Sequence, residues 1–348
     1  MVTAARTAET DADLLAEMRS ISEQQRSKPP RLRRREVTLD DGHRVGVALC
    51  GEGVPLLLVH GIMAEGMLYA RTLRRIAGLG FRVIAVDSAG HGRTAPLGRG
   101  GFRFGSYVDL HRRVLDHLGV EQALMVGHSM GGRIVVDLAA AEPDRALGVI
   151  PVNAAIGGGF DRFTYLGRFV PGLMPIGIGL LGADIALTAV RARHHAGSLA
   201  RLAAPSLGDR LRALPSLPAA FVATIGDQGS EQRLETLRDA DVPVAVVHSD
   251  RDLAIWWPFA KMAARSADAT LVRVEGAGHS WVIEHPDSLP ALLSELLAGP
   301  FGTAIAGRAK GPIADLWAPD ALGLVLDQPR SRPYVLDPGH TWRLETTG

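Results

Sequence analysis

The sequence predicts an α/β protein built on a mainly parallel β-sheet flanked by helices, with a helical cap inserted into it. Two observations predict this class. From Val37 onward, short runs rich in Val, Ile and Leu alternate with longer helical stretches, and Gly, Pro or Asp bounds the short runs. Several of these runs are apolar on both faces, as a buried parallel strand requires. We expect strands at residues 44–49, 55–59, 82–86, 124–126, 148–152, 242–248 and 270–274.

The first segment of the chain, residues 1–36, is expected to be an N-terminal extension and a basic linker. A possible amphipathic helix at residues 12–25 is followed by a double proline at 29–30 and four arginines between 31 and 35. The prolines stop a helix there. We interpret the charge run as a solvated linker, with contact to phosphate as the alternative.

The remaining boundaries follow the strand pattern. Residues 37–152 and 242–298 are expected to form the core, and residues 299–348 a C-terminal tail in which 333–344 offer an edge strand. The alternation lapses in residues 153–241, which we interpret as an inserted cap or lid.

The cap segment contains a long apolar stretch, residues 169–190, in which Asp184 is the only charge. Its length approaches a membrane span, but Pro171, Pro175 and repeated glycines interrupt the helix that spanning demands. We therefore expect a cap over a pocket. A transmembrane helix and a peripheral contact with lipid are the alternatives.

Composition and charge exclude several other classes. The 348 residues are 47% hydrophobic and 22% charged, a globular balance that excludes disorder as the main state. Lys and Arg number 38 against 37 Asp and Glu, so the net charge of +1 gives no overall field toward nucleic acid. We expect no nucleic-acid partner, and the sequence leaves the oligomeric state undetermined.

Cysteine usage and the N-terminus bear on location. The single cysteine, Cys50, cannot form an internal disulfide, and no Cys and His residues cluster at zinc spacing. Residues 1–17 contain no apolar run of signal-peptide length. We expect a protein of the cytoplasm that holds no structural metal.

The strongest chemical signal is the motif Gly127-His128-Ser129-Met130-Gly131, which directly follows a predicted strand and precedes a helical pattern. In a strand–turn–helix this tight, side chains two positions either side of the serine would collide with backbone. Glycine is therefore favoured at both places, and the serine hydroxyl projects above the sheet. The pattern predicts that Ser129 is a nucleophile.

With this motif, residues 37–298 resemble the α/β-hydrolase superfamily. Three further segments resemble parts of that family: Val59-His60-Gly61-Ile62 its oxyanion loop, residues 87–94 its D-x-x-G-x-G-x-S segment, and Gly276-Ala277-Gly278-His279 the loop that delivers the catalytic histidine. The resemblance implies a serine hydrolase that uses no metal and no organic cofactor.

A serine hydroxyl needs a base, and a histidine oriented by a carboxylate supplies one. We predict His279 as the base because it follows a predicted strand at a glycine-rich turn. The strand at 242–248 is followed by two candidate acids. The family's G-x-x-D pattern, with Ser249 in place of the glycine, favours Asp252 over Asp250. The order Ser129, Asp252, His279 is the one this fold uses.

The oxyanion of the tetrahedral intermediate needs donors. We predict the backbone N–H groups of Met130, after the nucleophile, and of Ile62, after His60-Gly61, with Met63 as the alternative to Ile62.

Other residues carry weaker signals. Asp87, Gly90 and Gly92 are expected to shape a loop beside the site. The adjacent pair His194-His195 is interpreted as a surface pair, since neighbouring helical side chains point in different directions. Trp256 and Trp257 either line the pocket or pack under the cap.

The prediction for function is an esterase that cleaves a small hydrophobic ester through an acyl-enzyme. The same residues could instead serve C–C bond hydrolysis, thioester hydrolysis, acyl transfer or cofactor-free haloperoxidase chemistry, because the cap sets the outcome. A non-catalytic binding protein on this scaffold is a third hypothesis. Ser129 argues against superfamily members whose nucleophile is an aspartate.

Overall fold

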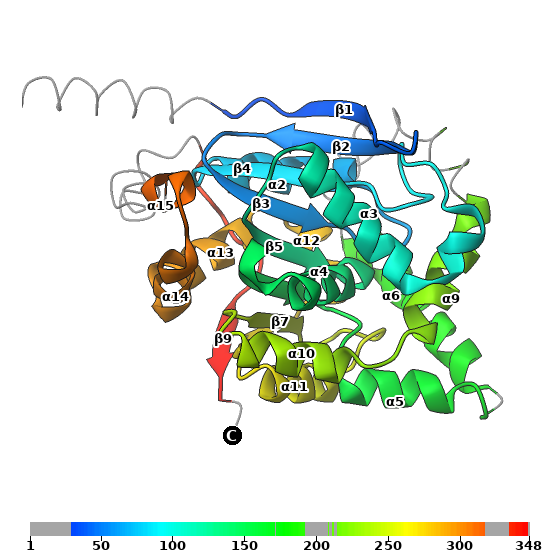
Figure 1. Cartoon of the computed structure of the whole chain (residues 1–348). Coiled ribbons are helices and arrows are strands. Elements are labelled where there is room, and N and C mark those ends of the chain that lie inside the picture. Colours follow the sequence, from blue (N-terminus) through cyan, green and yellow to red (C-terminus); the bar gives the residue numbers. More distant parts are fainter. Residues whose placement is uncertain are drawn as a thin grey trace, which may run out of the picture.

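The computed structural model describes residues 29–170, 172–191, 208, 211, 214–316 and 334–346. These residues form one sheet of nine strands in the order β1-β2-β4-β3-β5-β6-β7-β8-β9 (Figure 1). The strands are β1 (Arg33–Thr38), β2 (Arg44–Cys50), β3 (Val54–Val59), β4 (Phe81–Val86), β5 (Ala123–His128), β6 (Ala146–Val152), β7 (Ala245–Ser249), β8 (Thr270–Val274) and β9 (Trp342–Glu345).

Strands β4, β3, β5, β6, β7 and β8 run parallel, and antiparallel strands complete both edges. In register, Val59 lies opposite Gly127, and Ser249 lies opposite Val274. The loops that follow β3 and β5 therefore meet at one end of the sheet, as do the loops that follow β7 and β8.

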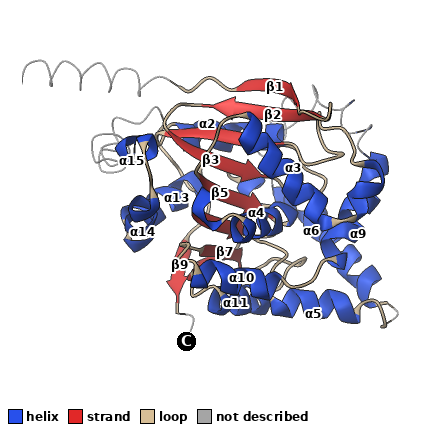
Figure 2. Ribbon diagram, viewed as in Figure 1, coloured by secondary structure: helices blue, strands red, loops and turns tan. Residues whose placement is uncertain are grey.

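Helices cover both faces of the sheet (Figure 2). They are α2 (Ala70–Ala77), α3 (Phe104–His117), α4 (Met130–Ala141), α5 (Gly158–Leu166), α6 (Leu173–Arg191), α9 (Leu217–Gly226), α10 (Ser230–Asp239), α11 (Trp257–Ser266), α12 (Trp281–Glu284), α13 (Ser288–Ala298), α14 (Pro300–Arg308) and α15 (Pro312–Leu316). Short 3-10 helices occupy Gly66–Tyr69, Gly98–Phe102, Pro143–Arg145 and Leu214–Ser216.

The core has two halves because strand side chains alternate between faces. On β3, Leu57 and Val59 pack with α3, α4, α10 and α11, whereas Leu56 and Leu58 pack with α2, α13 and α14. All four side chains are buried. This double burial explains why the parallel strands read as continuous apolar runs.

Strands were observed at all seven predicted places, with small differences at their ends. The predicted edge strand near the C-terminus is β9, which pairs with β8. Phe301 and Ile305 of α14 are buried in the core, so part of the predicted tail belongs to the body of the protein.

The predicted linker boundary at residue 36 is wrong, because residues 33–38 form β1 and pair with β2. Arginine is a poor strand signal, which hid this element. Arg33 and Arg35 are exposed, but Arg34 is largely covered and pairs with Glu65 at 3.0 Å and Asp87 at 3.2 Å. The helix predicted at residues 12–25 lies outside the described residues.

The predicted cap divides into two parts. Helices α5, α6 and α9 gather at the end of the sheet where the parallel strands finish (Figure 1). Helix α10, by contrast, buries Leu234 and Leu237 in the same core cluster as α4. It therefore belongs to the layer over the sheet, and the cap proper is shorter than the predicted 153–241.

Within the described part of the chain, no single helix is long and apolar enough to cross a membrane. The pair α13 and α14 meets that requirement only jointly, with a bend of 75° between the two helices.

Candidate active site

Ser129 lies at the sharp turn between β5 and α4, with φ of 56° and ψ of −119°. A positive φ is uncommon for a residue with a side chain. The flanking glycines permit the turn: a Cβ on Gly127 would lie 2.2 Å from the Gly131 carbonyl oxygen, and one on Gly131 would lie 2.2 Å from that of Val59. The turn therefore excludes a side chain at either glycine position, as predicted from the sequence.

Asp252 and His279 form a buried pair in the loops after β7 and β8. The Nδ1–H of His279 donates to Asp252 Oδ2 at 2.7 Å. The other carboxylate oxygen, Oδ1, accepts the backbone N–H groups of Ala254 at 2.8 Å and Ile255 at 2.9 Å. This arrangement fixes the imidazole and leaves its Nε2 as a potential base.

Asp250, the alternative acid, does not approach His279. Its Oδ1 accepts the N–H of Gly276 at 2.8 Å, and its side chain is partly exposed. It supports the histidine loop from outside. The structure thus pairs His279 with the favoured residue, Asp252.

Asn153 is a site residue that the sequence did not reveal. It follows β6 with φ of 44°, and its Nδ2 donates to Asp252 Oδ2 at 2.7 Å and Ser249 Oγ at 2.5 Å. Its Oδ1 accepts Trp281 Nε1–H at 2.9 Å. Its position directly after β6 could have indicated it. Strand β6 neighbours β7, which precedes Asp252, and the carboxyl ends of neighbouring parallel strands lie at the same end of the sheet.

Ile62 and Met130, the two residues predicted to supply the oxyanion donors, line the same pocket as Ser129. The N–H of Met63, the alternative, donates to His91 Nε2 at 3.3 Å. A Cβ on Gly61 would lie 3.0 Å from the Ser129 Cβ, so the loop after β3 closely approaches the nucleophile. This geometry favours Ile62 over Met63.

Neutral histidines hold the loops around the site. His60 Nε2 accepts the N–H of Ser88 at 2.9 Å, and burial lowers the pKa of His60 well below its ordinary value. His128 donates from Nε2 to the His279 carbonyl at 2.8 Å and accepts the Tyr69 hydroxyl at 3.0 Å. Burial lowers the pKa of His128 to about 3, so it stays neutral at pH 7.

The loop with Asp87 is structural, as predicted. Asp87 accepts the N–H groups of Gly66 at 2.8 Å and Arg93 at 3.1 Å. Gly92 has a positive φ, and a Cβ there would lie 2.2 Å from the Asp87 carboxylate.

The electrostatics of the Asp252–His279 pair suit a general base. Burial opposes the charge on Asp252, but the neighbouring His279 and its hydrogen bond lower the pKa of Asp252 to about 2. Burial likewise opposes the imidazolium, yet Asp252 outweighs it and raises the pKa of His279 above its ordinary 6.5.

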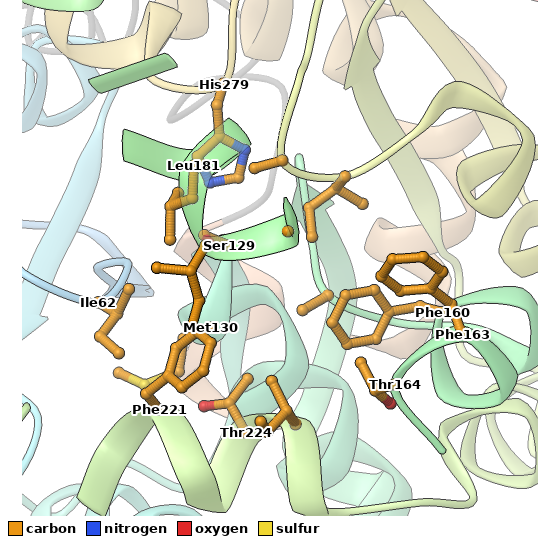
Figure 3. A pocket seen from close by; sticks show the side chains of 16 residues that line it. Ile62, Ser129, Met130, Phe160, Phe163, Thr164, Leu181, Phe221, Thr224 and His279 are labelled. Atoms are coloured by element: carbon orange, nitrogen blue, oxygen red, sulfur yellow. The ribbon is translucent and has the colours of Figure 1, made fainter. Parts of the chain in front are cut away.

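Ser129 and His279 share the wall of an apolar pocket of about 620 Å³, part of which is open to solvent. Figure 3 shows the His279 ring above Ser129, with Phe160 and Phe163 to one side and Ile62 to the other. The lining residues are Ile62, Ser129, Met130, Ala155, Phe160, Phe163, Thr164, Gly177, Ile178, Leu181, Phe221, Thr224, Ile225, Ala254, Ile255 and His279.

The polar groups of this lining are few and already engaged. The Thr164 hydroxyl donates to the Asp161 carbonyl at 3.0 Å, and the Thr224 hydroxyl donates to the Ala220 carbonyl at 2.8 Å. Among the described lining residues, none has a charged side chain apart from His279 when it is protonated.

Two weaker sequence signals have other outcomes. Trp256 is exposed and packs against the rings of Phe163 and Phe259, and neither Trp256 nor Trp257 lines the pocket. The pair His194-His195 lies outside the described residues. Among those that are described, no group of three or more His, Cys, Asp or Glu could hold a metal ion.

Comparisons with known proteins agree with the observed fold. The family model for the alpha/beta hydrolase fold matches residues 54–286. The chain is 31% identical to a protein of Mycobacterium phage D29 provisionally named a non-heme haloperoxidase, over 75% of this chain and 92% of that protein.

Two further likenesses extend the comparison. The chain is 31% identical to the dihydrolipoyllysine-residue acetyltransferase component of the acetoin cleaving system of Cupriavidus necator, over 74% of this chain and 68% of that protein. The crystal structure of an esterase from Rhodococcus sp. ECU1013 superposes with a TM-score of 0.59 at 23% identity, over 76% of this chain and 98% of the esterase.

Proposed function

This chain belongs to the α/β-hydrolase family, and from that premise we propose that it is a serine hydrolase that cleaves carboxylic esters with a hydrophobic acyl or alcohol group. The main support for this proposal is the way in which three side chains lie relative to one another. Ser129 and His279 line a single apolar pocket, and Asp252 holds His279 through a hydrogen bond of 2.7 Å.

The proposed acylation step uses these three side chains and two backbone donors. Ser129 Oγ attacks the ester carbonyl carbon and its proton passes to His279 Nε2, while Asp252 stabilises the imidazolium. The N–H groups of Ile62 and Met130 donate hydrogen bonds to the carbonyl oxygen as negative charge develops on it. His279 then gives its proton to the departing alkoxide oxygen, which leaves an acyl group on Ser129.

Deacylation reverses the roles. A water molecule loses a proton to His279 Nε2 and attacks the acyl carbon, and the second tetrahedral intermediate collapses as Ser129 Oγ takes that proton back. The products are a carboxylic acid and the free enzyme. The net reaction consumes one ester and one water, releases an alcohol and a carboxylic acid, and needs no redox partner.

The pocket supports a hydrophobic substrate. Its walls are almost wholly apolar, and the two threonine hydroxyls donate to their own helices. Each buried methylene contributes about 0.8 kcal/mol, or roughly a fourfold gain per carbon. Medium acyl chains are therefore expected to outcompete acetate by an order of magnitude or more.

A panel of 4-nitrophenyl esters from acetate to dodecanoate tests this. We expect kcat/KM to rise with chain length, and we expect Leu181→Ala in the pocket wall to weaken the rise. Leu187→Ala on the same helix is the control, because Leu187 is exposed. A maximum at acetate contradicts the apolar pocket, and a rise only in the presence of a lipid interface favours docking through the cap.

A second candidate, cofactor-free haloperoxidase chemistry, is favoured by the likeness to the phage protein. The acetyltransferase relative likewise keeps acyl transfer open. Both would use the same Ser129 acyl-enzyme with a different acceptor. Halide oxidation, assayed with hydrogen peroxide and a short carboxylic acid, distinguishes haloperoxidase activity from esterase activity. Partition of the acyl group between water and an added thiol or alcohol distinguishes acyl transfer from ester hydrolysis.

A further inference from the structure

Asp184 is the only charged residue of the apolar stretch 169–190, and its side chain is fully buried. It comes from the cap helix α6. A carboxylate placed in such surroundings carries a desolvation cost of several kcal/mol unless polar partners offset it. Its partners therefore indicate what it does.

Both partners are backbone groups of the active-site loops. Asp184 Oδ2 accepts the N–H of His279 at 2.9 Å, and Oδ1 lies 3.5 Å from the N–H of Leu253, the residue after Asp252. A single cap carboxylate thus bridges the loop that carries the acid and the loop that carries the base.

The main chain of His279 is held from two directions. Its N–H meets Asp184 of the cap, and its carbonyl accepts a hydrogen bond from His128 of the core at 2.8 Å. With Asp252 on the imidazole, the position of the ring is determined by one contact from the cap and two from the core.

The same helix also lines the pocket. Gly177 and Leu181 contribute to the wall, and Asp184 follows Leu181 by three positions and Gly177 by seven, so the three share one helix face. The face of α6 that encloses the substrate pocket is therefore continuous with the residue that contacts His279.

We propose that Asp184 is a positioning residue through which the cap sets the geometry and charge of the Asp252–His279 pair. This inference rests on the proposed function. The cap then contributes to the chemistry as well as to substrate selection, because a shift of α6 changes both the pocket wall and the histidine.

The charges around Asp184 fix the sign of the effect. His279 and Asp252 face it from the two loops, and His248 lies near Asp252, with Nε2 3.7 Å from Oδ2. Burial and the nearby Asp252 carboxylate raise the pKa of Asp184, whereas His279 and the two N–H groups oppose that rise. Ionised Asp184 stabilises the imidazolium and so raises the pKa of His279. Removal of that charge is expected to lower the pKa of His279.

The test measures the pKa of His279 by NMR titration of the imidazole in the full-length protein, with His279→Gln to assign the signal. Asp184→Asn is nearly isosteric, and its amide oxygen can still accept one N–H. We expect it to lower the pKa of His279 by about half a unit or more. Thr188→Val, one turn further along α6, is the matched control, because the buried Thr188 hydroxyl forms no hydrogen bond with the described residues.

A second readout is the rate of inactivation by a fluorophosphonate probe. We expect Asp184→Ala to slow the reaction roughly 10- to 100-fold on the pH plateau, since small misplacements of a catalytic group are costly. Asp184→Asn is expected to keep more of the rate and to move the acidic limb to lower pH. A thermal melt checks that each variant is folded. If Asp184→Ala does not fold, Asp184→Asn alone tests the role of Asp184.

An unchanged His279 pKa in Asp184→Asn overturns the inference, as does an equal shift in Thr188→Val. The titration needs no activity. Failure of the wild-type protein to react with the probe therefore counts against the proposed function, while the titration still decides the role of Asp184.

Discussion

The backbone of Ser129 is strained by its tight turn, and the strain places its hydroxyl in the pocket. Its N–H donates to the Val152 carbonyl at 2.9 Å, and its own carbonyl accepts the N–H of Gly132 at 3.0 Å. These contacts are backbone ones, so they do not need the side chain.

From this we predict that Ser129→Ala abolishes ester turnover and leaves the fold intact. The change removes one oxygen and no buried packing. A melting temperature within a few degrees of wild type together with lost turnover is the expected result. Loss of a cooperative melt would mean that Ser129 is structural.

The two aspartates after β7 differ in what they hold. Asp252→Asn is expected to lower kcat by about 10⁴, as the equivalent change does in a comparable triad, because the amide stabilises the wrong tautomer of His279. Asp250→Asn is the matched control, since the Asp250 carboxylate contacts the Gly276 N–H and the Arg273 guanidinium. Steady-state kinetics of both variants check this, and a larger loss in Asp250→Asn would contradict the assignment.

The raised pKa of His279 predicts the pH dependence. His279 acts as a base only when neutral, so activity is lost as pH falls through its pKa. Because Asp252 raises that pKa, the acidic limb of kcat/KM should be centred above pH 6.5. The limb should move toward lower pH in Asp252→Asn. A limb near pH 4 in the wild type would indicate that a carboxyl group is the base.

At the scale of elements, Arg133 joins the nucleophile helix to the cap. Its guanidinium is fully buried and pairs with Asp161 of α5 at 2.8 Å and with Asp227, directly after α9, at 2.9 Å. It also donates to the Ala155 carbonyl at 3.0 Å. One side chain of α4 thus contacts two cap segments.

We predict that Arg133→Ala lowers the free energy of unfolding by about 3–5 kcal/mol, because it leaves two largely buried carboxylates without this partner. Arg162→Ala is the control, since its pair with Glu231 spans 4.0 Å and is exposed, and it should cost ~1 kcal/mol or less. Urea denaturation measures both. Equal effects would contradict the role of Arg133.

The same scale shows what the sequence can predict. Strands with mostly buried side chains are recognisable in the sequence as apolar runs, so the six parallel strands and the antiparallel β2 were all predicted, whereas β1 is half exposed and rich in arginine. Helix α10 lay inside an insertion by sequence, although its leucines pack on the core. A local sequence pattern indicates that a side chain is buried, but it does not indicate which part of the protein covers that side chain.

The site divides in the same way. Ser129, Asp252 and His279 follow strands at glycine-rich or polar turns, which leave a local signal. Asn153 and Asp184 act through partners 99 and 95 residues away, at Asp252 and His279 respectively. No local pattern encodes such distances, so only the folded chain brings them together.

At the level of the whole molecule, the sheet brings three loops from distant parts of the chain to one end of its parallel strands. The cap covers an apolar pocket over these loops. We infer that this assembly makes Ser129 a nucleophile. We expect the turn after β5, the cap and the Asp252–His279 pair all to act on the reactivity of one atom, Ser129 Oγ.

The most direct measurement is the site of covalent labelling by a fluorophosphonate probe, determined by peptide mass spectrometry on the full-length protein. We predict a single adduct on Ser129, formed rapidly in the wild type and strongly slowed in His279→Ala. Ser280, which lies next to His279, is a matched serine that should stay unlabelled. An adduct on another serine, or ester turnover that persists in Ser129→Ala, would contradict the role of Ser129 as the nucleophile.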